Sequence, residues 1–208
     1  MSQPFRIAVL ASGSGTNLQA ILDKLHGGGE IEVVGVVSDK PDAGALERAR
    51  RAQVETAVFP GDEYEERDAR DRAIADWLAE READLIVLAG YMQLLSPEFV
   101  RRFRHRIVNV HPALLPSFPG LDAVRQALDH GSKVTGVTVH FVDEGVDSGP
   151  IILQAAVDVP QSRDWDELEE EIHRNEHRLL PEAICLIAAG RVRIDPRNPR
   201  LVAIEPEK

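Results

Sequence analysis

Leu85-Ile-Val-Leu-Ala89 is an uninterrupted apolar run that ends at Gly90. A strand that helices cover on both faces has this composition, because neither row of its side chains meets water. Other short β-branched runs alternate with amphipathic stretches through the first half of the chain, which predicts an α/β fold of three layers, with a mostly parallel twisted sheet and helices on both faces. The expected strands are residues 5–10, 31–37, 55–59, 84–89 and 107–110, and the expected helices are residues 17–26, 43–53, 64–82 and 96–104.

The pattern changes in the second half of the chain. Residues 134–142 alternate between apolar and polar side chains, and residues 150–159 form another extended run after a glycine-containing loop. We expect these two segments to make an antiparallel C-terminal addition to the sheet. A long helix should follow from about 164 to 189, with Cys185 as a buried thiol on its apolar face. The tail, residues 191–208, is rich in proline and charge and predicts no element.

Composition limits the class of protein. The chain has 208 residues, of which 43% are hydrophobic and 28% charged, as in a globular domain. We expect one domain over residues 1–208, with an N-terminal half at about 1–105 and a C-terminal half at about 106–190. The net charge of -11 argues against nucleic acid as a partner, because phosphate backbones attract basic surfaces. The apolar run before Ser12 is too short for a signal or membrane segment, so we expect a cytoplasmic protein.

Three side chains with complementary chemistry lie near the ends of expected strands. Asn109 and His111 are two positions apart, so an extended backbone places both on one face. Asp147 follows in the loop of residues 142–150. In acyl transfer the carbonyl oxygen becomes negative, which calls for a neutral donor, a proton donor and a group that orients the proton donor. Asn109, His111 and Asp147 are these three kinds of group.

Each of the three residues also has a structural interpretation. Asparagine at a strand end commonly forms a turn, and a single histidine is more often a structural residue whose ring nitrogens are satisfied. Aspartate in a glycine-containing loop is ordinary turn chemistry. The catalytic interpretation therefore rests on the three occurring together. His140, in the next expected strand, is interpreted as a structural residue.

Ser12-Gly-Ser-Gly-Thr-Asn17 follows the first strand and opens the first helix. Backbone N–H groups and a helix N-terminus predict an anion site there, with phosphate as the natural ligand and Thr16 or Asn17 as the helix cap. A dinucleotide site is one alternative, because Asp39 ends the second strand where a ribose-binding acid is expected. Leu18, however, occupies the position of the third glycine of that fingerprint. A tight turn without a ligand is the other alternative.

Two further clusters have competing interpretations. His173, Glu176 and His177 have helical spacing that suits a metal pair, but they lack further ligands, so a solvated helix face is the stronger interpretation. The segment Met92-Gln-Leu-Leu95 follows the strand that ends at Gly90 and borders the edge where ligands bind. Its apolar side chains suit a flat ring, and a hydrophobic approach to a helix explains them equally well.

These motifs occur in the order found in the phosphoribosylglycinamide formyltransferase family, which the chain resembles along nearly its whole length. The family transfers a formyl group from 10-formyltetrahydrofolate to the amine of N1-(5-phospho-D-ribosyl)glycinamide in purine (IMP) biosynthesis, without a metal. The resemblance therefore implies the formyltransferase fold and this activity, in a monomer or a homodimer. The segments that carry it are Ser12–Asn17, Ala89–Pro97, Asn109–Pro116, His140–Ile152 and Asn175–Pro181.

The resemblance also implies residue roles. Asn109, His111 and Asp147 would be catalytic, and Glu176 would hold the amino end of the nucleotide substrate. Three residues would hold its phosphate: Gly15, Thr16 and Asn17. The folate would contact a larger set: Arg67, Met92, Gln93, Leu94, Leu95, Asn109, Val142, Asp143, Glu144, Gly145, Val146 and Asp147. The family often has arginine where this chain has Gln93, so a backbone contact is retained there and a charge contact to the folate glutamate tail is lost.

Relatives with the same Asn, His and Asp leave the acceptor open. Sugar-amine formyltransferases are one alternative, although the phosphate loop favours a phosphorylated acceptor. Methionyl-tRNA formyltransferase has an extra C-terminal domain and formyltetrahydrofolate hydrolase an extra N-terminal one, and we expect neither in 208 residues. A catalytically silent nucleotide-binding module that uses only the glycine loop is the alternative from another class.

Overall fold

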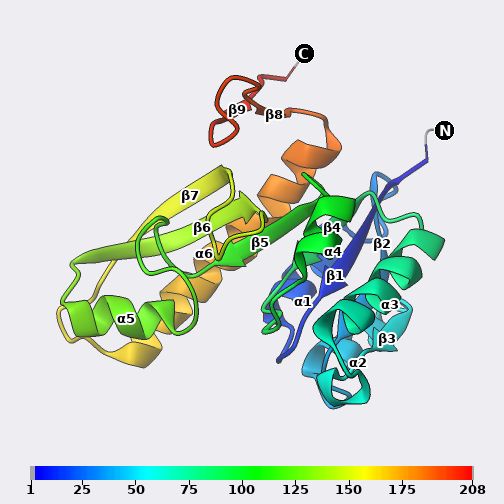
Figure 1. The fold of residues 1–208 in the computed structure, drawn as a ribbon. Coiled ribbons are helices and arrows are strands. Elements are labelled where there is room, and N and C mark those ends of the chain that lie inside the picture. Colours follow the sequence, from blue (N-terminus) through cyan, green and yellow to red (C-terminus); the bar gives the residue numbers. More distant parts are fainter. Residues whose placement is uncertain (1–2, 208) are drawn as a thin grey trace. The chain divides into compact units, whose positions relative to one another are not determined.

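The computed structural model describes residues 3–207. Seven strands form one sheet in the order β3-β2-β1-β4-β5-β6-β7, and two more form a separate pair, β8-β9 (Figure 1). The chain consists of two compact units, of which the first ends at Val108 and the second begins at Asn109. The mostly parallel sheet with an antiparallel addition confirms the expected fold class. The expectation of one domain over residues 1–208 stays a prediction.

The first unit alternates strands and helices, as the sequence predicts. Its pairs β1–β2, β1–β4 and β2–β3 are parallel. All four side chains of β4 are buried, so both faces of this strand are covered, as its apolar run indicates. The elements are β1 (Phe5–Leu10), α1 (Thr16–Leu25), β2 (Ile31–Ser38), α2 (Gly44–Arg51), β3 (Thr56–Val58), the 3-10 turn η1 (Gly61–Glu63), α3 (Arg67–Glu80), β4 (Leu85–Leu88) and α4 (Pro97–Arg102), followed by β5 (Ile107–His111) at the boundary.

The second unit combines an antiparallel strand pair with a long helix. Strands β6 and β7 pair antiparallel, and α6 packs against both. The α6 helix begins where the Asp164 carboxylate caps the backbone N–H groups of Asp166 and Glu167. Among residues 3–207, no helix has both the length and the apolar composition to cross a membrane. The elements are α5 (Ala123–His130), β6 (Val134–Phe141), β7 (Ile151–Asp158), α6 (Trp165–Ala188), β8 (Val192–Ile194) and β9 (Val202–Ile204).

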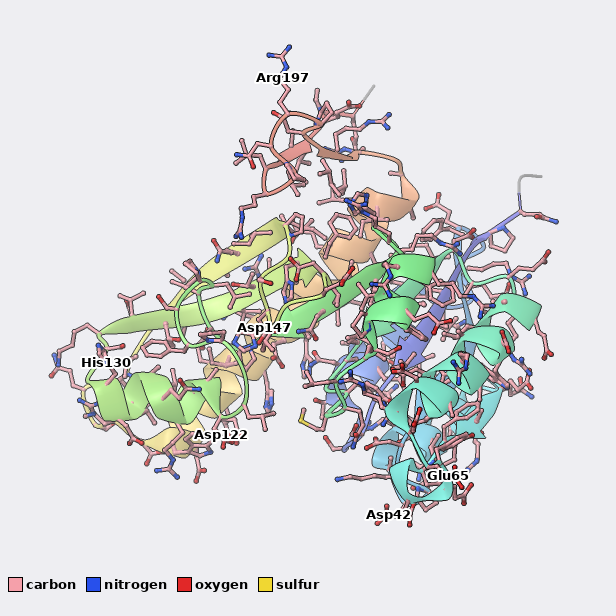
Figure 2. All side chains as sticks on the ribbon, in the orientation of Figure 1. Asp42, Glu65, Asp122, His130, Asp147 and Arg197 are labelled. Carbon is pink, nitrogen blue, oxygen red and sulfur yellow. The ribbon has the colours of Figure 1, made fainter. Side chains whose placement is uncertain are left out.

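Several local expectations are wrong. Helix α5, whose ends are marked by Asp122 and His130 in Figure 2, and the short β8–β9 pair were not expected. Cys185 is exposed, because it follows the buried Ile184 by one position and one residue turns a helix by about 100°. Helix α1 is preceded by Gly15 in the left-handed conformation and has no side-chain cap, so neither Thr16 nor Asn17 is the N-cap.

Candidate active site

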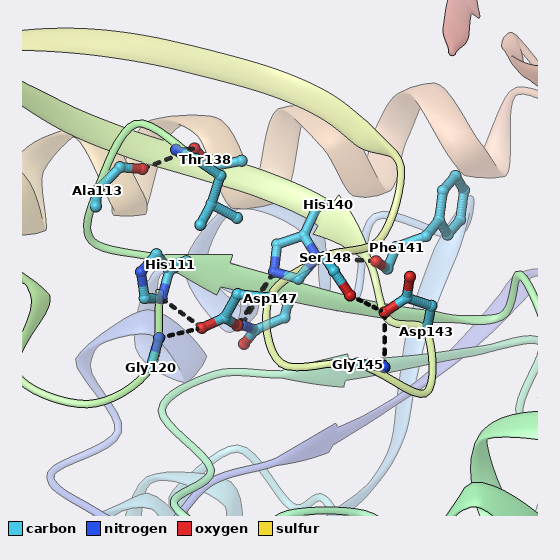
Figure 3. A network of polar contacts seen from close by, with 12 residues as sticks. His111, Ala113, Gly120, Thr138, His140, Phe141, Asp143, Gly145, Asp147 and Ser148 are labelled. Atoms are coloured by element: carbon cyan, nitrogen blue, oxygen red, sulfur yellow. Dashed lines mark hydrogen bonds and ion pairs between the residues drawn. The ribbon is translucent and has the colours of Figure 1, made fainter. Parts of the chain in front are cut away.

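A partly buried polar cluster of the second unit contains all three predicted catalytic residues, of which His111 and Asp147 are labelled in Figure 3. Asn109 and His111 lie on β5, and Asp147 lies in the loop between β6 and β7. The predicted convergence of amide, imidazole and carboxylate is therefore present. Thr138 of β6 fixes the segment after β5, because its hydroxyl donates to the Ala113 carbonyl at 2.7 Å.

His111 is almost completely buried, with 4% of its surface exposed. Its Nε2 lies 2.8 Å from the Phe118 carbonyl oxygen, which can only accept, so Nε2 carries a hydrogen and donates. Its Nδ1 lies 3.4 Å from Asp147 Oδ2. In the neutral imidazole Nδ1 therefore holds a lone pair that faces a carboxylate. A proton placed between His111 Nδ1 and Asp147 Oδ2 would contact both groups, so this pair is arranged to accept a proton.

Asp147 is held by the backbone of a neighbouring loop. The Gly120 N–H donates to Asp147 Oδ2 at 2.8 Å, and Asp147 itself has a φ of 49°, a conformation that aspartate tolerates. The turn before it is closed by Asp143, whose Oδ1 accepts from the Gly145 N–H at 3.1 Å and the Ser148 hydroxyl at 2.7 Å. The loop thus presents the carboxylate to the imidazole in a fixed orientation.

His140 is a residue of β6 with a satisfied ring nitrogen, as interpreted from the sequence, and it also joins this cluster. Its Nδ1 donates to the Phe141 carbonyl at 2.8 Å, and its Nε2 lies 3.3 Å from Asn109 Nδ2 and 3.6 Å from Asp147 Oδ1. When neutral, His140 accepts from the Asn109 amide; when protonated, it can donate to Asp147. The alternating pattern of β6 placed His140 on one face of the strand, but only the position of β6 beside β5 brings it to Asn109.

The Asn109 amide is oriented but loosely held. Its Nδ2 lies 3.3 Å from His140 Nε2 and 3.4 Å from Asp147 Oδ1. Both contacts are longer than well-formed hydrogen bonds of about 2.7–3.2 Å. A negatively charged oxygen could therefore replace either acceptor at small cost, as an oxyanion donor requires.

Burial and mutual charge set the protonation of the cluster. Burial lowers the pKa of His111, and although the Phe118 carbonyl and the Asp147 charge oppose it, the pKa stays below its ordinary 6.5. Burial alone would raise the pKa of Asp147. The contacts with His140, Gly120 and His111 outweigh burial and hold that pKa below its ordinary 3.8. At neutral pH the pair is therefore a carboxylate beside a neutral imidazole.

In the first unit, the glycine loop is tightly packed at one position and open at another. A Cβ on Gly15, which has a φ of 76°, would lie 2.6 Å from the Ala45 Cα, so only glycine fits there. A Cβ on Gly13 would meet nothing within 4 Å. Arg48 braces the loop by donating to the Ser14 carbonyl at 2.8 Å. The loop thus leads into the N-terminus of α1, where backbone N–H groups lack acceptors within the helix.

The segment of residues 92–95 alternates between outward and inward side chains. Met92 and Leu94 are 57% and 63% exposed, whereas Gln93 and Leu95 are half-buried. The Met92 N–H donates to the Ser12 hydroxyl at 2.8 Å, which ties this segment to the glycine loop. Both ends of the Gln93 amide are used inside the protein, by Arg70 and Asp39. Two exposed apolar side chains next to a glycine loop that precedes a helix N-terminus are suited to a ligand with a flat ring and a charged end.

The remaining predicted residues lie on other elements. Arg67 is an exposed residue at the start of α3, and Glu176 is a buried residue of α6, with 6% of its surface exposed. The rings of His173 and His177 stack with centroids 6.1 Å apart. Within residues 3–207, no group of three or more His, Cys, Asp or Glu side chains is placed to hold a metal ion. In the loop before Asp147, Glu144, Gly145 and Val146 are exposed.

Comparisons with known proteins identify the family of the chain. The family model described as formyl transferase matches residues 5–184. Phosphoribosylglycinamide formyltransferase of Haemophilus influenzae is 43% identical over 190 residues, which are 91% of this chain and 90% of that protein. The trifunctional purine biosynthetic protein adenosine-3 of Drosophila melanogaster is 44% identical over 92% of this chain, which spans only 14% of that protein.

Solved structures show the same likeness. Glycinamide ribonucleotide transformylase 1 from Symbiobacterium toebii superimposes with a TM-score of 0.94 and 50% identity, over 99% of this chain and 96% of that one. Phosphoribosylglycinamide formyltransferase from Brucella melitensis has a TM-score of 0.84 and 41% identity, over 92% and 99% of the two chains. The chain belongs to the formyl transferase family, and within it to the phosphoribosylglycinamide formyltransferases.

Proposed function

We propose that the protein transfers the formyl group of 10-formyltetrahydrofolate to the amine of N1-(5-phospho-D-ribosyl)glycinamide, giving the N2-formyl product and tetrahydrofolate in purine biosynthesis. The observation that carries this proposal is the convergence of Asn109, His111 and Asp147 in one partly buried cluster. Full-length bacterial relatives of this chain with the name phosphoribosylglycinamide formyltransferase support the choice of acceptor.

The catalytic cluster acts first as a proton acceptor. The neutral substrate amine attacks the formyl carbon, and Asp147 with the neutral His111 takes a proton from the amine nitrogen, directly or through water. His111 then becomes a cation held between the Asp147 carboxylate and the Phe118 carbonyl. Its positive charge and the Asn109 N–H stabilise the negative charge that develops on the formyl oxygen.

The second half of the reaction returns the same proton. His111 and Asp147 release it toward the folate nitrogen as the bond between that nitrogen and the formyl carbon breaks. The folate nitrogen thus leaves as a neutral amine. In the net reaction the formyl group moves from the folate nitrogen to the substrate amine, and one proton moves in the opposite direction. Neither step needs a metal, because the charge that develops is met by an imidazolium and an amide donor.

Residues of the first unit would bind the substrates. The loop of Gly15, Thr16 and Asn17 suits the nucleotide phosphate, because a helix N-terminus stabilises an anion. Met92, Leu94 and the backbone of Gln93 would contact the folate, together with Arg67. In the second unit, the loop of residues 142–147 would contribute further folate contacts and Glu176 would bind the amino end of the nucleotide.

The test is an acceptor-dependent assay. Purified protein is mixed with 10-formyltetrahydrofolate and the phosphorylated glycinamide, and release of reduced folate is followed by absorbance. We expect turnover only when both substrates are present. Consumption of the donor without acceptor would indicate a hydrolase, and equal use of an unphosphorylated sugar amine would indicate the sugar-amine class. No turnover, with thermal stabilisation by the nucleotide alone, would indicate a binding module.

The location and assembly of the protein stay predictions. We propose that it acts in the cytoplasm, as a monomer or a homodimer, without nucleic acid or membrane partners. Size-exclusion chromatography with light scattering, at the concentration of the assay, distinguishes the two assembly states.

A further inference from the structure

Arg70 is a charged residue buried in the first unit, on helix α3. Only 3% of its surface is exposed, although it stands one turn after the exposed Arg67. Its Nε and Nη2 donate to Asp71 Oδ1 at 3.0 and 2.8 Å. The other Asp71 oxygen accepts from the backbone N–H of Ser96. A buried guanidinium is costly unless its donors are satisfied, so such a residue is fixed in one geometry.

The remaining donors of Arg70 reach the segment of residues 92–95. Its Nη1 donates to Gln93 Oε1 at 3.1 Å, and its Nη2 to the Leu94 carbonyl at 3.3 Å. Gln93 in turn donates through Nε2 to Asp39 Oδ2 at 2.9 Å. Asp39 is buried, and its second oxygen accepts no hydrogen bond among residues 3–207. The Gln93 amide is therefore an inward bridge between one cation and one carboxylate.

We propose that Arg70 is a positioning residue for the folate, which acts through Gln93 and the Leu94 carbonyl on the backbone of residues 92–95. The proposal rests on the proposed function, because that segment carries the expected folate contacts. Arg70 itself has its donors turned to Asp71, Gln93 and Leu94, so it does not need to touch the ligand. The exposed side chains of Met92 and Leu94 stand on either side of Gln93, so the inward bridge of Gln93 fixes the backbone that presents them.

Glutamine at position 93 is then a matched partner of Arg70. An arginine there would bring a second guanidinium to the Nη1 of Arg70, where the amide oxygen now accepts at 3.1 Å. Like charges at this separation repel, and the acceptor for Nη1 would be lost. The buried cation Arg70 thus disfavours an arginine at position 93, and without that arginine position 93 makes no charge contact to the folate tail.

The test compares Arg70→Gln, Gln93→Met and the double variant with the control Arg72→Gln. Arg72 lies on the same helix and forms an exposed ion pair with Glu98 at 3.7 Å. We expect Arg70→Gln and Gln93→Met each to raise the KM for 10-formyltetrahydrofolate about tenfold, with kcat and the KM for the nucleotide within about twofold, since a lost hydrogen bond to a charged group costs about that factor. Gln93→Met keeps the Arg70–Asp71 pair, so it remains informative if Arg70→Gln folds poorly.

Two outcomes distinguish positioning from general stability. Because both residues act through one bridge, the double variant should raise the KM little more than Arg70→Gln does. Backbone N–H groups of residues 92–95 should also exchange with deuterium about tenfold faster or more in Arg70→Gln and at the wild-type rate in Arg72→Gln. An unchanged KM in both single variants of an active enzyme would overturn the proposal and leave the proposed function intact. If the wild type shows no turnover, the function fails, and the exchange rates still decide whether Arg70 anchors the segment.

Discussion

Replacing Asp147 by asparagine keeps the shape of the side chain and removes its charge. Asparagine tolerates the left-handed backbone at this position, where φ is 49°. Its amide oxygen can still accept from the Gly120 N–H, which lies 2.8 Å from Asp147 Oδ2. The variant should therefore fold with the loop in place. It should fail as a proton acceptor, because an amide next to His111 Nδ1 cannot take a proton from the reacting amine.

The structure indicates the size of both effects. The carboxylate faces His111, His140 and Asn109 at 3.4, 3.6 and 3.4 Å. These contacts are long, so their loss together should lower the free energy of unfolding by about 1–3 kcal/mol, which corresponds to a decrease in Tm of about 2–10 °C. Loss of the general base should lower kcat by a factor of about 10²–10⁴, with KM values within about threefold.

The assay is steady-state turnover at a temperature where the variant is fully folded, checked by thermal unfolding. Asp129→Asn, on the exposed side of helix α5, is the matched control and should behave as the wild type. A kcat of Asp147→Asn within about threefold of the wild type would refute the role of this carboxylate, since a general base contributes about 10²-fold or more. So would a loss of rate that matches the loss of folded protein.

Three other predictions concern the protonation of His111, the packing of the glycine loop and the proposed role of Asn109. The folded-state pKa of His111 lies below 6.5, so the contribution of His111 to the free energy of unfolding should be present above pH 6.5 and lost as the pH falls below it. In urea unfolding at several pH values, His111→Asn should reduce the change in the free energy of unfolding with pH. An unchanged pH dependence would contradict the assignment. Gly15→Ala should lower the free energy of unfolding by about 1–3 kcal/mol more than Gly29→Ala, because both have positive φ but only Gly15 meets a neighbour at 2.6 Å; equal losses in thermal unfolding would reject this packing argument. Asn109→Ala should lower kcat about 10²–10³-fold with little change in KM, and a rise in KM alone would show that Asn109 binds the ground state instead.

Local patterns predicted the parts of the fold that depend on local chemistry. The apolar run of β4 indicated that both faces of this strand are covered. The alternation of β6 did not indicate its burial, because every residue of β6 except Val134 is buried. The long helix α6 begins at Trp165, next to the expected start at about residue 164. Helix α5 was missed although Ala123, Val124, Ala127 and Leu128 have helical spacing, because eight residues are a short signal. Strands β8 and β9 have three residues each, too few for any periodicity.

The sequence predicted which residues form the candidate site, but it did not predict the contacts among them. Asn109, His111 and Asp147 could be chosen by chemistry, whereas the carbonyl of Phe118 and the N–H of Gly120 are backbone groups that carry no sequence signal. His140 required the neighbouring positions of two strands. Arg70 was missed for the same reason: an arginine in a polar helix gives no sign of burial until its partners at positions 93 and 94 are placed.

The most direct test of the central claim follows the formyl carbon itself. With carbon-13 in the formyl group of the donor, nuclear magnetic resonance distinguishes the donor, the formylated amine and free formate. We predict that the wild-type protein moves the label to the amine of the phosphorylated glycinamide, and that His111→Ala does so at least about 10²-fold more slowly. Label that stays in the donor, or that appears as formate when the amine is present, would contradict the account.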